Sequence, residues 1–75
     1  MSAAAITEMA IKHLYAGEIL QKVARDFSPL MEHMSDEQVA AAQKLRDLVI
    51  AYAEAELIVT GGLCDVAEME RSDSE

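Results

Sequence analysis

Apolar residues recur at helical spacing along the first third of the chain. At about 100° per residue, one broad stripe collects apolar and small residues together with a histidine. The stripe contains Ile6, Met9, Ala10, His13, Ala16, Gly17, Leu20, Val23, Ala24 and Phe27. No segment shows the strict alternation that is typical of a strand. We therefore predict a first helix from about Ala4 to Phe27, ended by Ser28-Pro29 because the residue before a proline avoids helical backbone angles.

A second helix is predicted by a more specific signal. Ser35-Asp-Glu-Gln38 has the Ser and Gln spacing of a capping box, so the helix should begin at Asp36. It should end near Thr60, because Gly61-Gly62 supplies the left-handed residue that often follows a helix. Apolar residues within 63–70 recur at helical spacing, so the sequence also allows a short third helix after the glycines. The expected domain spans residues 1–70, and residues 71–75 form an acidic flexible tail.

Both predicted helices are apolar on two sides. A lone hairpin can bury one stripe per helix, so the remaining apolar rows predict an interface. The expected fold is an all-α antiparallel two-helix hairpin that pairs into a dimeric four-helix bundle. The residues expected at the dimer interface or at a target-binding interface are Ile11, Tyr15, Ile19, Val39, Ile50 and Leu57. The pattern leaves open which of the two interfaces they form.

Folding the first helix back on the second predicts particular contacts. Small residues should face large ones in the pairs Gly17 with Tyr52, Ala24 with Leu45, and Phe27 with Ala41 or Ala42. The same register brings His13 close to Glu56. We interpret them as a polar pair whose members satisfy each other's polar atoms. The alternative is a proton-transfer pair or pH sensor, because histidine titrates near neutrality.

The charge and cysteine content narrow the class of protein. Fourteen Asp and Glu against six Lys and Arg give a net charge of −8, which repels the phosphate backbone of nucleic acids. The single cysteine, Cys64, cannot form an internal disulfide, which favours a reducing compartment. No signal peptide or membrane segment is predicted. We expect a cytoplasmic protein, in its own cell or in a host cell if a mobile element encodes it.

The residues that carry catalytic chemistry are scattered. His13, His33 and Cys64 lie far apart without the spacing of metal ligands, and Gly61-Gly62 follows a helix where a phosphate-binding loop would precede one. We predict no catalytic residues, no metal, no cofactor and no small-molecule substrate.

Two helices joined by a short polar turn resemble the hairpin subunit of small dimeric four-helix bundles such as the Rop protein. The resemblance covers architecture alone, and the basic RNA-facing surface of that family is missing here, so no residue or activity is carried over. The expected function is a non-enzymatic interaction module that regulates or inhibits a target protein through an apolar helical face. The alternatives are a secretion-chaperone-like or assembly subunit that holds a larger helical partner, and an acidic mimic of nucleic acid.

Overall fold

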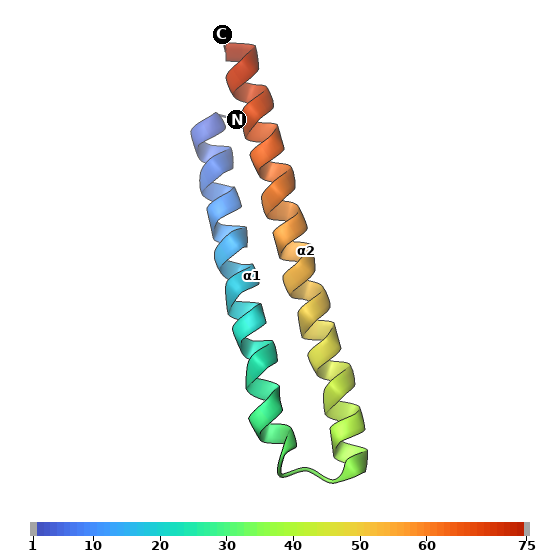
Figure 1. The fold of residues 1–75 in the computed structure, drawn as a ribbon. Helices are drawn as coiled ribbons and strands as arrows, with labels where there is room; N and C mark the ends of the chain where they lie inside the picture. The colour runs from blue at the N-terminus through green and yellow to red at the C-terminus, as the bar shows by residue number, and fades with distance from the viewer. Residues whose placement is uncertain (1, 75) are drawn as a thin grey trace.

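The chain folds into two antiparallel helices, which confirms the predicted all-α hairpin. In the computed structural model, which describes residues 2–74, helix α1 spans Ala3–Met31 and helix α2 spans Asp36–Ser74 (Figure 1). The Cα atoms extend over 60 × 14 × 12 Å, so the molecule is a thin rod. The longer helix α2 continues past the first residues of α1, and both ends of the chain lie at the end of the rod opposite the turn (Figure 1).

Helix α1 is longer at its C-terminal end than the sequence predicts. Ser2 caps its N-terminus, because the Ser2 side chain accepts a hydrogen bond from the backbone N–H of Ala5 at 3.2 Å. The predicted end at Phe27 is wrong, since α1 passes through Pro29 and ends at Met31. Pro29 has no N–H to donate to the backbone oxygen of Arg25, and the helix ends two residues further on.

The turn ends in the predicted capping box. The backbone N–H of Ser35 donates to Gln38 Oε1 at 3.0 Å, and the backbone N–H of Gln38 donates to Ser35 Oγ at 3.2 Å. These reciprocal bonds satisfy two donors that the first turn of α2 would otherwise leave free. The capping box fixes where α2 begins, and so sets the length of the connection.

Helix α2 does not end at the glycine pair, so that prediction is wrong. It runs unbroken through Gly61 and Gly62 to Ser74, and no described glycine has a positive φ. Residues 63–70 therefore belong to α2 and do not form a separate helix. Residues 71–74 of the predicted tail continue α2, and Glu75 lies outside the described residues. Each glycine in a helix interior costs about 1 kcal/mol relative to alanine, and packing of the helix beyond the pair, where Ala67 is buried, opposes that cost.

The two helices meet along one row of residues on each, which we call the inner seam. In α2 the residues that are not exposed are separated alternately by three and four positions, the spacing of an antiparallel coiled coil. They are Val39, Ala42, Arg46, Val49, Ala53, Glu56, Thr60, Leu63, Ala67 and Glu70. The row with the same spacing in α1 is Ala3, Ile6, Ala10, His13, Gly17, Leu20, Ala24, Phe27 and Met31. The buried positions are mostly small, which lets the helix backbones approach closely.

The side of α2 that faces α1 differs from the predicted one, although the level at which the helices meet is close to it. A Cβ built on Gly17 would lie 3.5 Å from Ala53 O, 3.5 Å from Glu56 Cβ and 3.5 Å from Leu57 Cδ2, so Gly17 does not face Tyr52. Tyr52 and Leu45 are each 58% exposed, and the predicted pairs Gly17–Tyr52 and Ala24–Leu45 are wrong. The row of α2 that contains Tyr52 lies beside the seam. Both rows are spaced by threes and fours, so periodicity alone could not choose between them.

Candidate interaction surface

A histidine and a glutamate meet within the inner seam, as the sequence predicts. His13 Nδ1 of α1 lies in hydrogen-bond and ion-pair contact with the Glu56 carboxylate of α2. Their side chains are 37% and 28% exposed, so both are only partly removed from water. Within the described residues, no group of three or more His, Cys, Asp or Glu side chains is arranged to hold a metal ion. The two side chains hydrogen-bond to each other across the seam.

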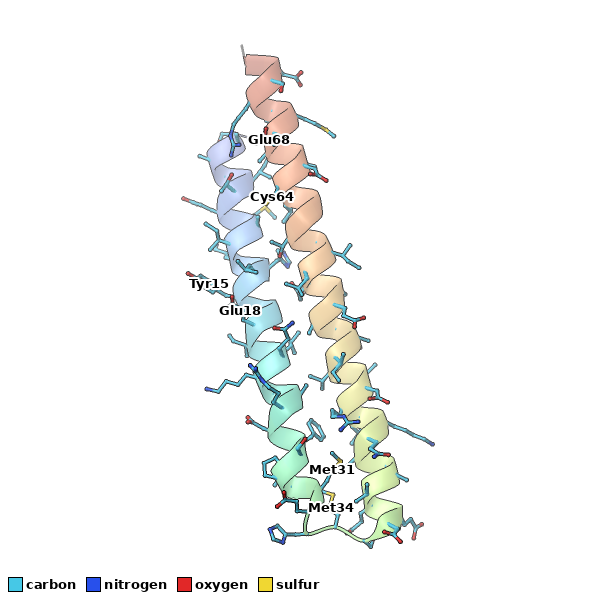
Figure 2. The ribbon with its side chains drawn as sticks, in the orientation of Figure 1. Tyr15, Glu18, Met31, Met34, Cys64 and Glu68 are labelled. Atoms are coloured by element: carbon cyan, nitrogen blue, oxygen red, sulfur yellow. The ribbon has the colours of Figure 1, made fainter. Side chains whose placement is uncertain are left out.

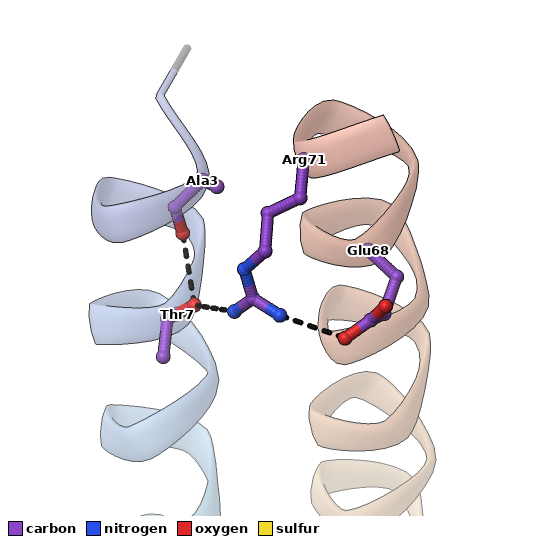
Figure 3. Close-up of polar contacts among 4 residues, drawn as sticks. All are labelled: Ala3, Thr7, Glu68 and Arg71. Carbon is purple, nitrogen blue, oxygen red and sulfur yellow. Dashed lines mark hydrogen bonds and ion pairs between the residues drawn. The ribbon is translucent and has the colours of Figure 1, made fainter. Parts of the chain in front are cut away.

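A polar contact ties the C-terminal part of α2 to the start of α1. Arg71 Nη1 donates to Glu68 Oε1 at 2.7 Å, and Arg71 Nη2 donates to Thr7 Oγ1 at 3.4 Å (Figure 3). The Thr7 hydroxyl in turn donates to the backbone oxygen of Ala3 at 2.8 Å. Because Glu68 and Arg71 are exposed, these bonds contribute little stability. They do show which flanks of the two helices lie on the same side of the hairpin.

The same side of the hairpin carries an open groove of mixed polarity towards the turn. Its volume is about 550 Å³. The lining residues are Gln21, Ala24, Arg25, Ser28, Arg46, Ile50, Ala53 and Glu54. Arg46 sits in the inner seam, and its buried Nε has no hydrogen-bond partner, while Nη2 lies 3.7 Å from Asp47 Oδ1. We call this side of the hairpin the groove side.

The opposite side is lined by apolar residues and is uncovered. Thr7, Gln21 and Ser28 of α1 share the groove side with Ile50 and Arg71 of α2, so the other flank of each helix faces the opposite side. We call that surface the apolar face. It comprises Met9, Ala16, Ile19, Val23 and Leu30 of α1 and Ala41, Leu45, Leu48, Tyr52, Ala55, Val59, Gly62, Val66 and Met69 of α2.

None of these residues carries a charge, although Lys12 and Asp26 lie in the same row of α1 as Ile19, seven residues before and after it. The large side chains of the apolar face are open to water, with exposed fractions from 40% at Met9 to 63% at Ile19 and Met69. Such a long uncharged surface is typical of a protein-binding site.

The six residues predicted at an interface do not gather on one surface. Ile19 belongs to the apolar face, whereas Ile50 lines the groove and Leu57 lies against Gly17 on the groove side. Val39 is half-buried in the inner seam. Ile11 and Tyr15 point outward from α1, and Figure 2 shows Tyr15 directed away from α2.

Sequence reasoning placed the apolar row of α2 inside the hairpin and so missed the larger surface. A signal was present in the sequence. That row keeps its alternation of three and four residues from Ala41 to Met69 without a single charge.

Comparisons with known proteins assign no function to this surface. No protein-family model, no curated protein and no solved structure matches this chain. Among the described residues, neither helix has an apolar stretch long enough to cross a membrane. The geometry defines a helical hairpin with one uncovered apolar side and one side of mixed polarity.

Proposed function

We propose that this protein is a non-enzymatic interaction module that pairs with a second copy of itself to form a four-helix bundle and regulates a target protein by binding it. The observation that carries the proposal is the apolar face, which runs along most of the hairpin without a charged residue. Leu45, Leu48 and Val59 are 58%, 52% and 42% exposed on that face. Burying a side chain of this size fully contributes about 1.5–3 kcal/mol, so covering the face strongly favours association.

The dimensions of the hairpin suit self-association. The Cα atoms of this side extend over 60 × 14 Å, which leaves room for an interface of standard size, about 800 Å² of buried surface on each partner. A second hairpin has the same length and the same uncharged surface, so it matches the face without exposing a new apolar edge. Two hairpins stacked in this way form a four-helix bundle.

Target binding would use residues that the dimer leaves on its outer surface. Ile11 and Tyr15 point away from the apolar face, and Tyr15 is 59% exposed. On the groove side, Leu57 is 38% exposed and adds further apolar area. Tyrosine is enriched among the residues that dominate binding energy, so Tyr15 is the best single candidate for a target contact. Binding there would regulate or inhibit the target by occupying one of its surfaces.

The test is the mass of the purified chain in solution. Sedimentation equilibrium over a concentration series, together with far-UV circular dichroism, should show a helical species of twice the 8.2 kDa chain mass. A helical monomer at high concentration would overturn self-association. A chain that is unfolded or aggregated until a different protein is supplied would support the assembly-subunit function, in which that protein covers the apolar face.

A further inference from the structure

The apolar face contains a glycine that the isolated hairpin does not need. Gly62 lies in the interior of α2, where glycine is among the least favourable residues, and its φ is not positive. A Cβ built on Gly62 would meet nothing within 4 Å. Neither backbone conformation nor packing inside the hairpin therefore explains the absence of a side chain. Because it has no Cβ, glycine is suited to a place where another group approaches the backbone closely.

We propose that a second copy docks antiparallel on the apolar face, with the two turns at opposite ends of the bundle, and seats its Leu48 on Gly62. This inference rests on the dimerisation proposed above and adds the orientation and register of the two chains. It follows from the order of small and large residues along α2. When the row is reversed about Ala55, two of its four pairs join a small with a large side chain, Ala41 with Met69 and Leu48 with Gly62. The other two pairs are apolar, Leu45 with Val66 and Tyr52 with Val59.

Other registers fit less well. Moving the centre of symmetry half a heptad towards the turn would place Tyr52 on its own copy and leave Ala41 opposite Gly62 with a void between them. In the proposed register, two Ala55 residues meet at the centre and let the two copies of α2 approach closely. The row of α2 therefore specifies one antiparallel alignment.

Helix α1 supports the same centre independently. The contacts of Gly17 with Ala53 and of His13 with Glu56 fix the levels of the two helices, and they place Ala16 beside the level of Ala55. Reversing the row of α1 about Ala16 sets Met9 against Val23 of the second copy and Ile19 against Lys12, whose aliphatic stem can cover it. In both helices, therefore, an alanine lies at the level of the two-fold axis, Ala16 in α1 and Ala55 in α2. With the two turns at opposite ends, α1 of one copy packs on α1 of the other, and α2 packs on α2 of the other.

The charge distribution favours this orientation as well. Among the described residues, the turn half, 18–52, has four Lys and Arg against six Asp and Glu, a net charge of −2. The other half, 2–17 and 53–74, has two against seven, a net charge of −5. Turns at opposite ends place each strongly acidic half beside the weakly acidic half of the other chain. If the two turns lay at the same end, the halves with a net charge of −5 would lie side by side, and the repulsion between the two chains would increase.

The neighbouring glycines provide a matched pair of variants. Gly62 lies on the apolar face, whereas Gly61 points away from it on the same helix, and a Cβ on either would meet nothing within 4 Å in the hairpin. We expect Gly62→Leu to raise the dimer dissociation constant at least tenfold, because the new side chain occupies the place of Leu48 from the second copy. Gly61→Leu should leave the constant within about twofold of the unchanged chain, and circular dichroism checks that both variants stay helical.

Disulfide trapping tests the orientation directly. In a Cys64→Ser background, Ala55→Cys should give a disulfide-linked dimer in most chains, because the two residues meet at the two-fold axis within the range that a disulfide spans. Met69→Cys alone should not link, because residue 69 lies 14 residues, about 21 Å, from the two-fold axis in each copy and in opposite directions, so the two cysteines are about 40 Å apart. Mixing the Met69→Cys chain with an Ala41→Cys chain should restore the disulfide, because the proposed register sets residue 69 of one copy against residue 41 of the other.

The two proposals fail in different ways. A dimer that persists while Ala55→Cys stays unlinked, or while Gly62→Leu leaves the dissociation constant unchanged, overturns the antiparallel register and leaves the proposed dimer standing. A chain that is monomeric before any substitution overturns both.

Discussion

Replacing Gly17 by alanine should stabilise the protein. Gly17 is buried in the inner seam at the middle of α1, and its φ is not positive, so alanine can adopt its backbone conformation. The added Cβ would lie 3.5 Å from each of three atoms of α2, in Ala53, Glu56 and Leu57. That separation is an ordinary van der Waals contact, so neither helix has to move. The new methyl group would fill space that already exists.

Two contributions set the size of the effect. Alanine is favoured over glycine in a helix interior by about 0.8–1.0 kcal/mol. Burying one methyl group adds up to about 0.8 kcal/mol. The expected gain is therefore about 1–2 kcal/mol in the free energy of unfolding, which corresponds to a rise in Tm of at least about 4 °C for a domain of this size.

The assay is urea unfolding followed by circular dichroism at 222 nm, with all variants at one protein concentration because the proposed association would contribute to stability. Gly17→Leu is the matched control, since three more carbon atoms have no room and should cost about 1–3 kcal/mol. A loss of stability in Gly17→Ala would refute the helix separation described here. An unchanged or higher stability of Gly17→Leu would show that Gly17 does not lie in the seam.

Three further substitutions test other parts of the hairpin by the same unfolding assay. Ser35→Ala removes the N-cap of α2 and should cost about 1 kcal/mol, and no loss would contradict the capping box. Arg46→Met should stabilise the protein by about 1 kcal/mol, because it removes a buried Nε without a partner; a marked loss would show that Arg46 makes a stabilising contact. His13→Leu and Glu56→Leu should each cost about 1 kcal/mol while the double variant costs less than their sum, and strict additivity would count against the contact.

The sequence predicted the class of fold and several of its local details. Helix-forming composition and a capping box at Ser35 were sufficient to predict two helices and the start of the second, although both helices end later than predicted. The contact between His13 and Glu56 was also predicted, because the length of the connection fixes the approximate level at which residues of the two helices meet. These features depend on local backbone chemistry and on chain length.

The sequence did not predict which side of α2 faces α1. Two rows in α2 share the same spacing, and the row containing Tyr52 is the more hydrophobic, so hydrophobicity favoured it for the hairpin's interior. The structure instead places Ala53 and Ala67 in the seam, where small side chains allow close helix packing. The glycine pair was misread for a related reason. A helix end was predicted from local preference, whereas α2 continues because residues beyond Gly62 pack on α1.

The composition of the inner seam connects the fold to the proposed function. The buried apolar residues are Ile6 and five alanines, Ala10, Ala24, Ala42, Ala53 and Ala67, and no large side chain is fully buried among the described residues. Alanine buries too little apolar area to offset the conformational entropy lost when two long helices form. The larger apolar residues lie outside the seam, where only another chain can cover them. In the proposed dimer, the stability of the hairpin and its association with a second copy would therefore be one process, because the residues that hold the bundle together would also stabilise each helix.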